Sequence, residues 1–182
     1  MALEVWRIDP AHSGIHFAIR YLGVSKIHGR FTKWAGIVQF DPASPASSQV
    51  EIQIDAASID TNEPKRDRHL QSPDFLDVTR YPEIAFKSTR VEATGRDRYR
   101  VTGDLSMRGV TQSVTLEVEH GGSVKDPWGN NRSGFSLNGV IDRRDFGMTF
   151  NALLEGGGQL LGDQVEFSID LEAVKAMEAA AS

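Results

Sequence analysis

Apolar and polar residues alternate along most of this chain, a pattern typical of β-strands that bury one face. In the first clear run, Ile15, Phe17 and Ile19 share one face, while His16 and Arg20 have the opposite parity. Seven further runs follow, at about residues 29–40, 50–56, 84–86, 99–107, 114–118, 135–141 and 165–171. The pattern therefore predicts eight strands.

The second run changes face in the middle. Phe31 has one parity, whereas Trp34, Val38 and Phe40 have the other. One extra residue in a strand moves all later side chains to the opposite face of the sheet. We therefore expect a bulge between Phe31 and Trp34.

Only two connections in this pattern, at 57–82 and 145–154, could hold helices. Strands joined without crossover helices form antiparallel sheets, and eight such strands can close into a barrel. We predict an all-β fold, an eight-stranded antiparallel barrel with short helical inserts between strands 3 and 4 and between strands 7 and 8; a two-sheet sandwich is the alternative. A single domain at 1–175 and a tail at 176–182 are expected, with turns at 121–122 and 126–131.

Small residues interrupt the apolar face of several strands. Gly36, Ala56, Gly103 and Gly139 each lie two residues from larger apolar groups. This predicts an elongated apolar cavity, and the alternative is that the glycines mark bends in the strands. The residues expected to line the cavity share the apolar parity or lie in the inserts: Ile15, Phe17, Ile19, Phe31, Trp34, Val38, Phe40, Ile52, Ile54, Phe75, Leu76, Phe86, Val101, Leu105, Leu116, Phe135, Leu137, Phe146, Phe167 and Ile169.

The connection at 57–82 is far longer than an ordinary hairpin loop and is rich in charge. On a short helix Arg66 and His69 would lie on one side. Residues 142–145 carry a similar mixture of guanidinium and carboxylate groups, and guanidinium groups match phosphate geometry. The predicted contacts to a polar head group are His12, Arg66, Asp67, His69, Arg144 and Asp145. The alternative is that these residues cap helical turns or form surface ion pairs.

Charge and composition exclude several classes of function. The net charge of -5 disfavours binding to nucleic acid or to an anionic membrane surface. The chain has no cysteine, which excludes thiol catalysis. No run of about 18 apolar residues predicts a membrane span, and the first residues lack a signal-peptide pattern. We expect a cytoplasmic protein, or a periplasmic one if a signal has been removed.

The candidate chemistry favours binding over catalysis. The five histidines form no metal-ligand motif, and Ser123 and Ser136 lie in no nucleophile motif. We expect no metal, no cofactor and no catalytic residue. Two alternatives are an enzyme that uses His69 with Asp67 or Asp145 on a hydrophobic substrate, and a stress-related interaction protein with an incidental cavity.

Five ordered motifs give the chain a resemblance to a known family. They are WRIDPAHSGIHFAIRYLGVSKIHGRF at 6–31, SIDTNEPKRDRHLQSPDFLD at 58–77, YPEIAFKS at 81–88, GDLSMRGVTQSV at 103–114 and DRRDFGM at 142–148. In these motifs the chain resembles the YceI-like, lipocalin-like polyisoprenoid-binding proteins of bacteria. The resemblance implies a barrel that binds the tail of a long isoprenoid lipid, such as a polyprenyl diphosphate or an isoprenoid quinone. It also implies pairing of two chains into a homodimer.

Overall fold

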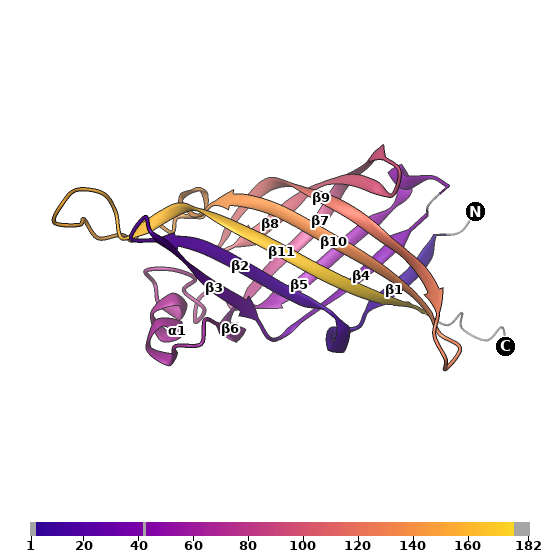
Figure 1. The fold of residues 1–182 in the computed structure, drawn as a ribbon, viewed down its shortest axis with the longest axis horizontal. Coiled ribbons are helices and arrows are strands. Elements are labelled where there is room, and N and C mark those ends of the chain that lie inside the picture. Colours follow the sequence, from indigo (N-terminus) through magenta and orange to yellow (C-terminus); the bar gives the residue numbers. More distant parts are fainter. Residues whose placement is uncertain (1–2, 42, 177–182) are drawn as a thin grey trace.

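In the computed structural model, which describes residues 3–41 and 43–176, the strands wind around one elongated barrel (Figure 1). The strand segments are β1 (Glu4–Ile8), β2 (Gly14–Tyr21), β3 (Ser25–Phe31), β4 (Trp34–Phe40), β5 (Gln49–Asp55), β6 (Ile59–Asp60), β7 (Glu83–Gly95), β8 (Arg98–Met107), β9 (Val110–Lys125), β10 (Asn131–Asp142) and β11 (Leu161–Lys175). The connections hold one α-helix, α1 (Pro64–Gln71), and the 3-10 helices η1 (Pro10–His12), η2 (Pro45–Ser47), η3 (Ala56–Ser58) and η4 (Arg143–Phe146). The predicted all-β fold is confirmed.

The eleven segments make eight antiparallel strands, because β1 continues into β2, β3 into β4 and β5 into β6. Neighbours around the ring run β1-β4-β5-β7-β8-β9-β10-β11, and β1 closes the ring by pairing with β11. The segments β2, β3 and β6 extend the same wall, since β2 pairs with β11 and β3, and β3 pairs with β6. The predicted eight-stranded barrel is confirmed, and the closing pair excludes the sandwich.

Two of the long strands, β1–β2 and β3–β4, are interrupted at residues that do not continue the hydrogen-bonded ladder of the sheet. Pro10 begins η1, and Asp9 caps this turn by accepting a hydrogen bond from the backbone N–H of Ala11 at 3.0 Å. The second break falls at 32–33: Phe31 still pairs with β6, and Trp34 begins the pairing of β4 with β5. The irregularity expected between Phe31 and Trp34 is confirmed, although the strand breaks over two residues instead of bulging by one.

The turn expected at 121–122 was wrong. Gly121 and Gly122 lie inside β9, where the ladder slips opposite Gly134, and Gly122 has a φ of 107° that favours glycine. The reason is that these glycines form a bulge in a longer strand, and the turn follows at 126–130. The short helical insert predicted between strands 7 and 8 is η4, which is four residues long and ends at Phe146. Beyond η4 the chain folds back on itself, and Leu153 pairs with Gln159.

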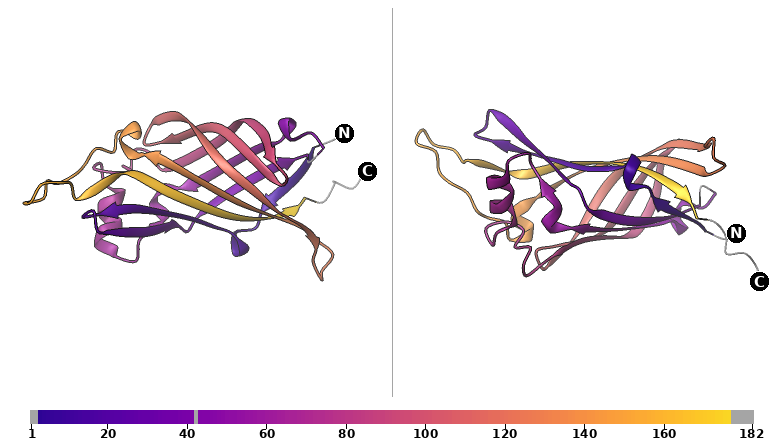
Figure 2. Two further views of the ribbon diagram at one scale, coloured as in Figure 1. Left: turned by 45° about the horizontal axis from the view of Figure 1, so that its top comes forward. Right: turned by 90° about the horizontal axis from the view of Figure 1, so that it is seen from below.

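The barrel has two different ends. In Figures 1 and 2, α1, the β2–β3 turn and residues 151–160 lie at one end, here called the α1 end. The β9–β10 turn and the last residues of β11 lie at the other, here called the terminal end. One apolar cluster, which includes Trp6, Phe40 and Leu137, fills the terminal half of the barrel, and a second, around Phe75 and Phe146, lies toward the α1 end. The predicted tail lies outside the described residues beyond Ala176.

Candidate ligand-binding site

Most of the inner wall of the barrel is apolar. All twenty residues predicted to line a cavity belong to the two apolar clusters of the interior, thirteen of them buried and seven half-buried. This follows from the alternation in the strands, which turns every second side chain inward. Their contacts with a ligand remain a prediction.

The terminal half of the barrel is tightly packed. An apolar cavity of about 30 Å³ lies between Phe40, Val91, Val101, Phe135 and Leu171. This volume holds about one or two water molecules, whereas sites for small organic ligands measure about 300–1,000 Å³. A long ligand can therefore reach this half only if the surrounding side chains move.

The α1 half of the inner wall is more open. Five apolar side chains pack on the cluster around Phe75 and Phe146, yet each is only half-buried: Phe17, Ile19 and Tyr21 of β2, Ile27 of β3 and Ile141 of β10. A packed core would bury such apolar side chains almost completely. Their partial exposure means that part of their apolar surface is available for a ligand to cover.

Aromatic rings of one strand cover glycines of the next. A Cβ atom at Gly29 would lie 2.3 Å from Cζ of Phe17, and one at Gly139 would lie 2.4 Å from Cζ of Phe167. The same crowding, from another phenylalanine, occurs at Gly103. The sequence suggested that the glycines open space for a cavity. In the structure they do not do so by themselves, because aromatic rings occupy that space. Instead they allow large rings to lie against the wall of the barrel.

The insert between β6 and β7 covers the α1 end. Phe75 and Leu76 follow α1 and are buried in the same apolar cluster as Phe146. Arg108, in the β8–β9 turn, donates hydrogen bonds to the carbonyl of Pro73 at 2.7 Å and to that of Gly147 at 2.8 Å. One side chain thus ties the cover to the segment after η4.

His69 belongs to this cover and does not pair with Asp67. Its Nε2 lies 2.9 Å from Oδ2 of Asp74, and its ring meets that of Phe150 edge-on with centroids 4.8 Å apart. Asp67 instead accepts a hydrogen bond from the backbone N–H of Thr61 at 2.8 Å. The predicted pair of His69 with Asp67 is therefore not formed in this structure.

The two predicted head-group arginines near the α1 end are also engaged within the chain. Arg66 donates to the hydroxyl of Thr61 at 2.8 Å and to its carbonyl at 2.6 Å. Arg144 pairs with Asp142 at 2.7 Å, and this hydrogen bond lowers the pKa of the carboxyl to about 2. Asp145 is exposed on η4. The structure does not bring the six residues together, and most of their contacts are those of caps and ion pairs.

Sequence reasoning missed Arg143, the neighbour of a predicted residue. Its guanidinium is buried and donates to the carbonyls of Gly162 at 2.8 Å, Met148 at 2.7 Å and Phe150 at 2.8 Å. Asp163 lies 3.8 Å away and offsets part of the buried charge. Arg143 therefore holds the segment after η4 against the start of β11. Only the arginine pair in the DRRDFGM motif hinted at it.

An ion-pair network lies at the terminal end and includes His12. Arg132 donates to Asp126 at 2.7 Å, to Asp9 at 2.9 Å and to Glu172 at 3.1 Å. Its hydrogen bond to Asp126 lowers the pKa of that carboxyl to about 2. Nδ1 of His12 lies 2.8 Å from Asp9. His12 is thus part of this network and is separate from the predicted head-group residues of the α1 end.

A polar cluster also lies inside the terminal end. Nε2 of His120 shares a hydrogen bond of 2.7 Å with Oγ of Ser133, which is 1% exposed. The imidazole stacks on Phe135 with ring centroids 4.9 Å apart. Burial lowers the pKa of His120, a shift that the charge of Asp97 opposes. The cluster therefore favours a neutral imidazole in an apolar setting.

No group of three or more His, Cys, Asp or Glu side chains among the described residues is arranged to hold a metal ion. Within residues 3–41 and 43–176 no helix is long and apolar enough to cross a membrane.

A closed antiparallel barrel with an apolar inner wall and one covered end defines a lipocalin-like barrel. Residues 6–173 match the model of the YceI-like domain family. The chain is 44% identical to Protein YceI of Shigella flexneri over 135 residues, which are 74% of this chain and 70% of that protein. The chain belongs to the YceI-like family, and the resemblance seen in its motifs is confirmed.

Solved structures share this architecture. BcnA of Burkholderia cenocepacia superposes with a TM-score of 0.80 and 25% identity, covering 91% of this chain and 98% of that one. A polyisoprenoid-binding domain from Saccharophagus degradans, implicated in plant cell wall breakdown, superposes with a TM-score of 0.68 over 96% of this chain and 99% of that domain. At 13% identity the second likeness concerns the fold alone.

Proposed function

We propose that this protein is a noncatalytic carrier that holds the tail of a long isoprenoid lipid inside its barrel. The observation that carries the proposal is the set of inward apolar side chains in the α1 half that remain half-buried. Membership of the YceI-like family supports it, as does the shared fold with a domain that binds polyisoprenoids.

The tail supplies most of the binding free energy in this proposal. Each buried CH₂ group contributes about 0.8 kcal/mol, whereas a hydrogen bond to a head group contributes about 1 kcal/mol net. A tail of several isoprene units therefore outweighs a few polar contacts. Affinity should depend on tail length more strongly than on the identity of the head.

The tail first covers the open wall of the α1 half, formed by Phe17, Ile19 and Tyr21 of β2 and their neighbours. A longer tail reaches the terminal half by displacing side chains around the cavity of about 30 Å³. Affinity should then rise with each added isoprene unit and level off once the displaced core opposes further entry.

The ligand in this proposal is either a polyprenyl diphosphate or an isoprenoid quinone. The pairing of two chains into a homodimer is a separate prediction. A diphosphate requires cationic partners, and Arg66 and Arg144 now bind Thr61 and Asp142. A diphosphate head would have to compete with those contacts, whereas a quinone head would not.

A tail-length series tests the proposal. Isoprenoid alcohols with one head and increasing tail length are titrated into delipidated protein, and the dissociation constants are measured by quenching of tryptophan fluorescence. A dissociation constant that falls several-fold for each added unit and then levels off supports the carrier. Equal affinity for all lengths would contradict it.

A further inference from the structure

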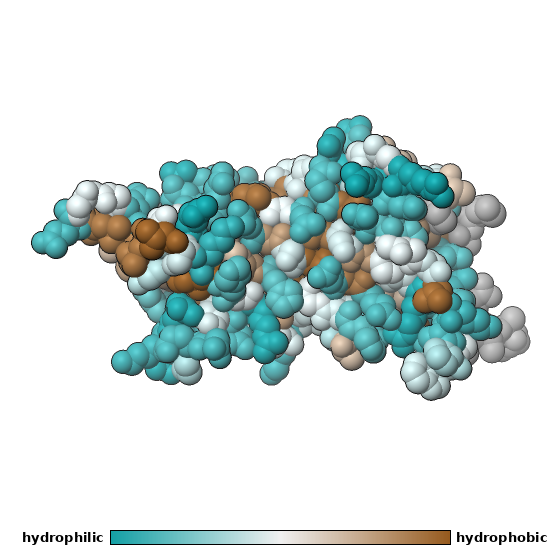
Figure 3. All heavy atoms as spheres, in the orientation of Figure 1, coloured by the Kyte–Doolittle hydropathy of each residue, from teal (hydrophilic) through white to brown (hydrophobic). Residues whose placement is uncertain are grey.

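Two exposed apolar tips lie side by side at the α1 end. Leu22 and Val24, in the β2–β3 turn, are 38% and 82% exposed, and Leu153, in the 151–160 loop, is 86% exposed. The backbone N–H of Leu22 donates to the carbonyl of Leu160 at 2.8 Å, which joins the turn to the base of the loop. The loop projects beyond the barrel in Figure 1, and Figure 3 shows apolar side chains gathered at this end.

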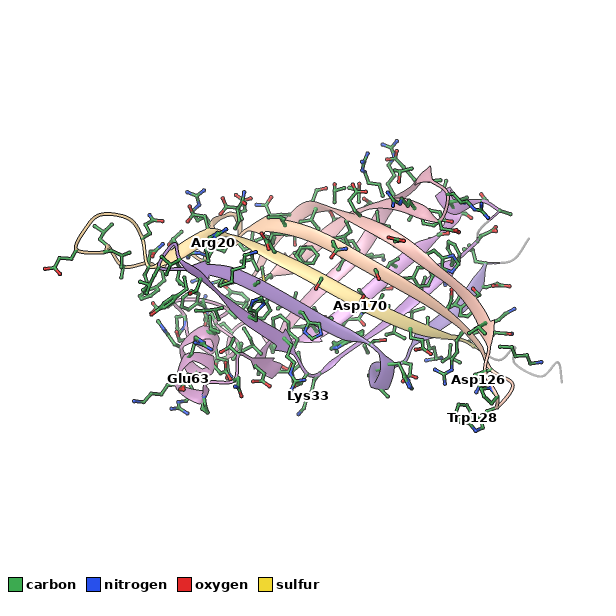
Figure 4. All side chains as sticks on the ribbon, viewed as in Figure 1. Arg20, Lys33, Glu63, Asp126, Trp128 and Asp170 are labelled. Atoms are coloured by element: carbon green, nitrogen blue, oxygen red, sulfur yellow. The ribbon has the colours of Figure 1, made fainter. Side chains whose placement is uncertain are left out.

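The strands that carry the first tip have a charge opposite to that of the whole protein. Residues 10–40 contain no Asp or Glu, whereas the complete chain has a net charge of -5. Arg20, Lys26, Arg30 and Lys33 fall in this segment and are all exposed. Figure 4 shows Arg20 near the α1 end of the barrel.

The basic side chains of this hairpin face one another across the strands. Arg20 lies directly opposite Lys26, and His16 lies opposite Arg30. The like charges of Arg20 and Lys26 in direct register destabilise the sheet. Neighbouring strands relieve part of this repulsion, because Glu166 pairs with Lys26 at 2.9 Å and Asp60 pairs with Arg30 at 3.3 Å, whereas Arg20 has no ion pair within the described residues.

We infer that this end of the barrel docks onto the surface of an anionic phospholipid bilayer. The apolar tips enter the acyl boundary, and Arg20 and Lys26 behind them meet the lipid phosphates, as on other interfacial amphipathic surfaces. The inference rests on the proposed carrier function, and it deepens that function by naming the source of the lipid. The other face of β2 carries Phe17, Ile19 and Tyr21, so the docked strand adjoins the open inner wall.

The opposite end of the barrel provides a matched control. Trp128 is 81% exposed in the β9–β10 turn, and Figure 4 shows it beside Asp126. Here Arg132 is surrounded by the carboxylates of Asp9, Asp126 and Glu172, so an anionic bilayer should be repelled. An apolar tip beside an arginine that carboxylates already neutralise should not dock.

Flotation of the whole chain with vesicles tests the inference. Vesicles of phosphatidylglycerol mixed with phosphatidylcholine should bind the protein, and added salt should weaken binding. The double variant V24D and L153D should lose binding by about tenfold or more, and the double variant R20S and K26S should lose its dependence on phosphatidylglycerol. Trp128→Ser should bind like the natural chain.

Several results would overturn the inference. They are equal binding to vesicles of phosphatidylcholine alone, undiminished binding by V24D and L153D, and a greater loss for Trp128→Ser. If V24D and L153D change only the self-association of the protein in sedimentation, this surface binds a second copy instead.

Uptake of an isoprenoid alcohol without vesicles separates docking from carriage. Both double variants should take up the alcohol like the natural chain, because the altered residues lie outside the barrel interior. Failure of uptake by the natural chain contradicts the carrier and leaves the flotation result standing on its own. Loss of uptake by the variants would overturn the separation of the docking surface from the interior.

Discussion

The ring of Phe167 lies over Gly139, which is its partner on the neighbouring strand: a Cβ atom added to the glycine would be 2.4 Å from Cζ of the ring. The absence of a side chain at Gly139 is therefore what allows the ring to rest on the wall of the barrel. If the lumen holds a lipid tail, this pair controls part of its width.

Gly139→Ala should weaken tail binding. The methyl group would push the ring of Phe167 toward the lumen, at a cost of about 1–3 kcal/mol of stability from overpacking. We expect a several-fold rise in the dissociation constant of a long isoprenoid alcohol, measured by fluorescence titration. Gly134→Ala is the control on the same strand, since no atom lies within 4 Å of its added Cβ. Equal effects of the two substitutions would contradict the role of the ring.

Arg143→Met should destabilise the fold. The substitution leaves three carbonyls without their donor, and each lost hydrogen bond costs about 1 kcal/mol. The free energy of unfolding in urea should fall by about 3 kcal/mol. Arg144→Met removes the neighbouring guanidinium, whose side chain is 56% exposed, and should change the free energy little. A comparable loss in both variants would show that burial of Arg143 is not the cause.

Mild acid should destabilise the protein through His120. Burial lowers the pKa of His120 in the folded state below the value of about 6.5 in the unfolded chain. Below about pH 6.5 the unfolded state therefore binds a proton that the folded state does not. The free energy of unfolding then decreases as the pH decreases. We expect urea midpoints to decrease from about pH 7 to pH 5, and His120→Gln should flatten this slope. An unchanged slope in the variant would assign the effect to other groups.

Strong acid should act through the network around Arg132. The pKa of Asp126 is about 2 in the folded state against an ordinary value of 3.8. Its contribution is present above about pH 4 and is lost as the pH falls toward 2. Arg132→Met returns this carboxyl toward its ordinary pKa, so thermal melting should depend less on pH in that window. A steeper dependence in the variant would contradict this assignment.

Strand alternation predicted most of the fold, and the exceptions have physical reasons. Alternation did not predict the segment β1. The segment is short, and the apolar residue Val5 has the parity opposite to that of Trp6 and Ile8, which hides the alternation. The bulge at Gly121 looked like a turn because glycine pairs serve both purposes.

The inner wall could also be predicted, but the polar contacts could not. Inward residues follow from a period of two, whereas burial of Arg143 depends on carbonyls of the segment after η4 and of β11, which meet only in the folded chain. The contact of His120 with Ser133 likewise depends on the ladder slip between β9 and β10. Neither arrangement leaves a spacing signal in the sequence.

Mass spectrometry of the protein purified without detergent tests the carrier most directly. Native spectra of the intact chain are compared with spectra of an organic-solvent extract. A polyprenyl lipid or isoprenoid quinone recovered in stoichiometric amount, or taken up when offered, is the predicted result. A chain that carries no such lipid and takes up none across the tail-length series would contradict the proposed function.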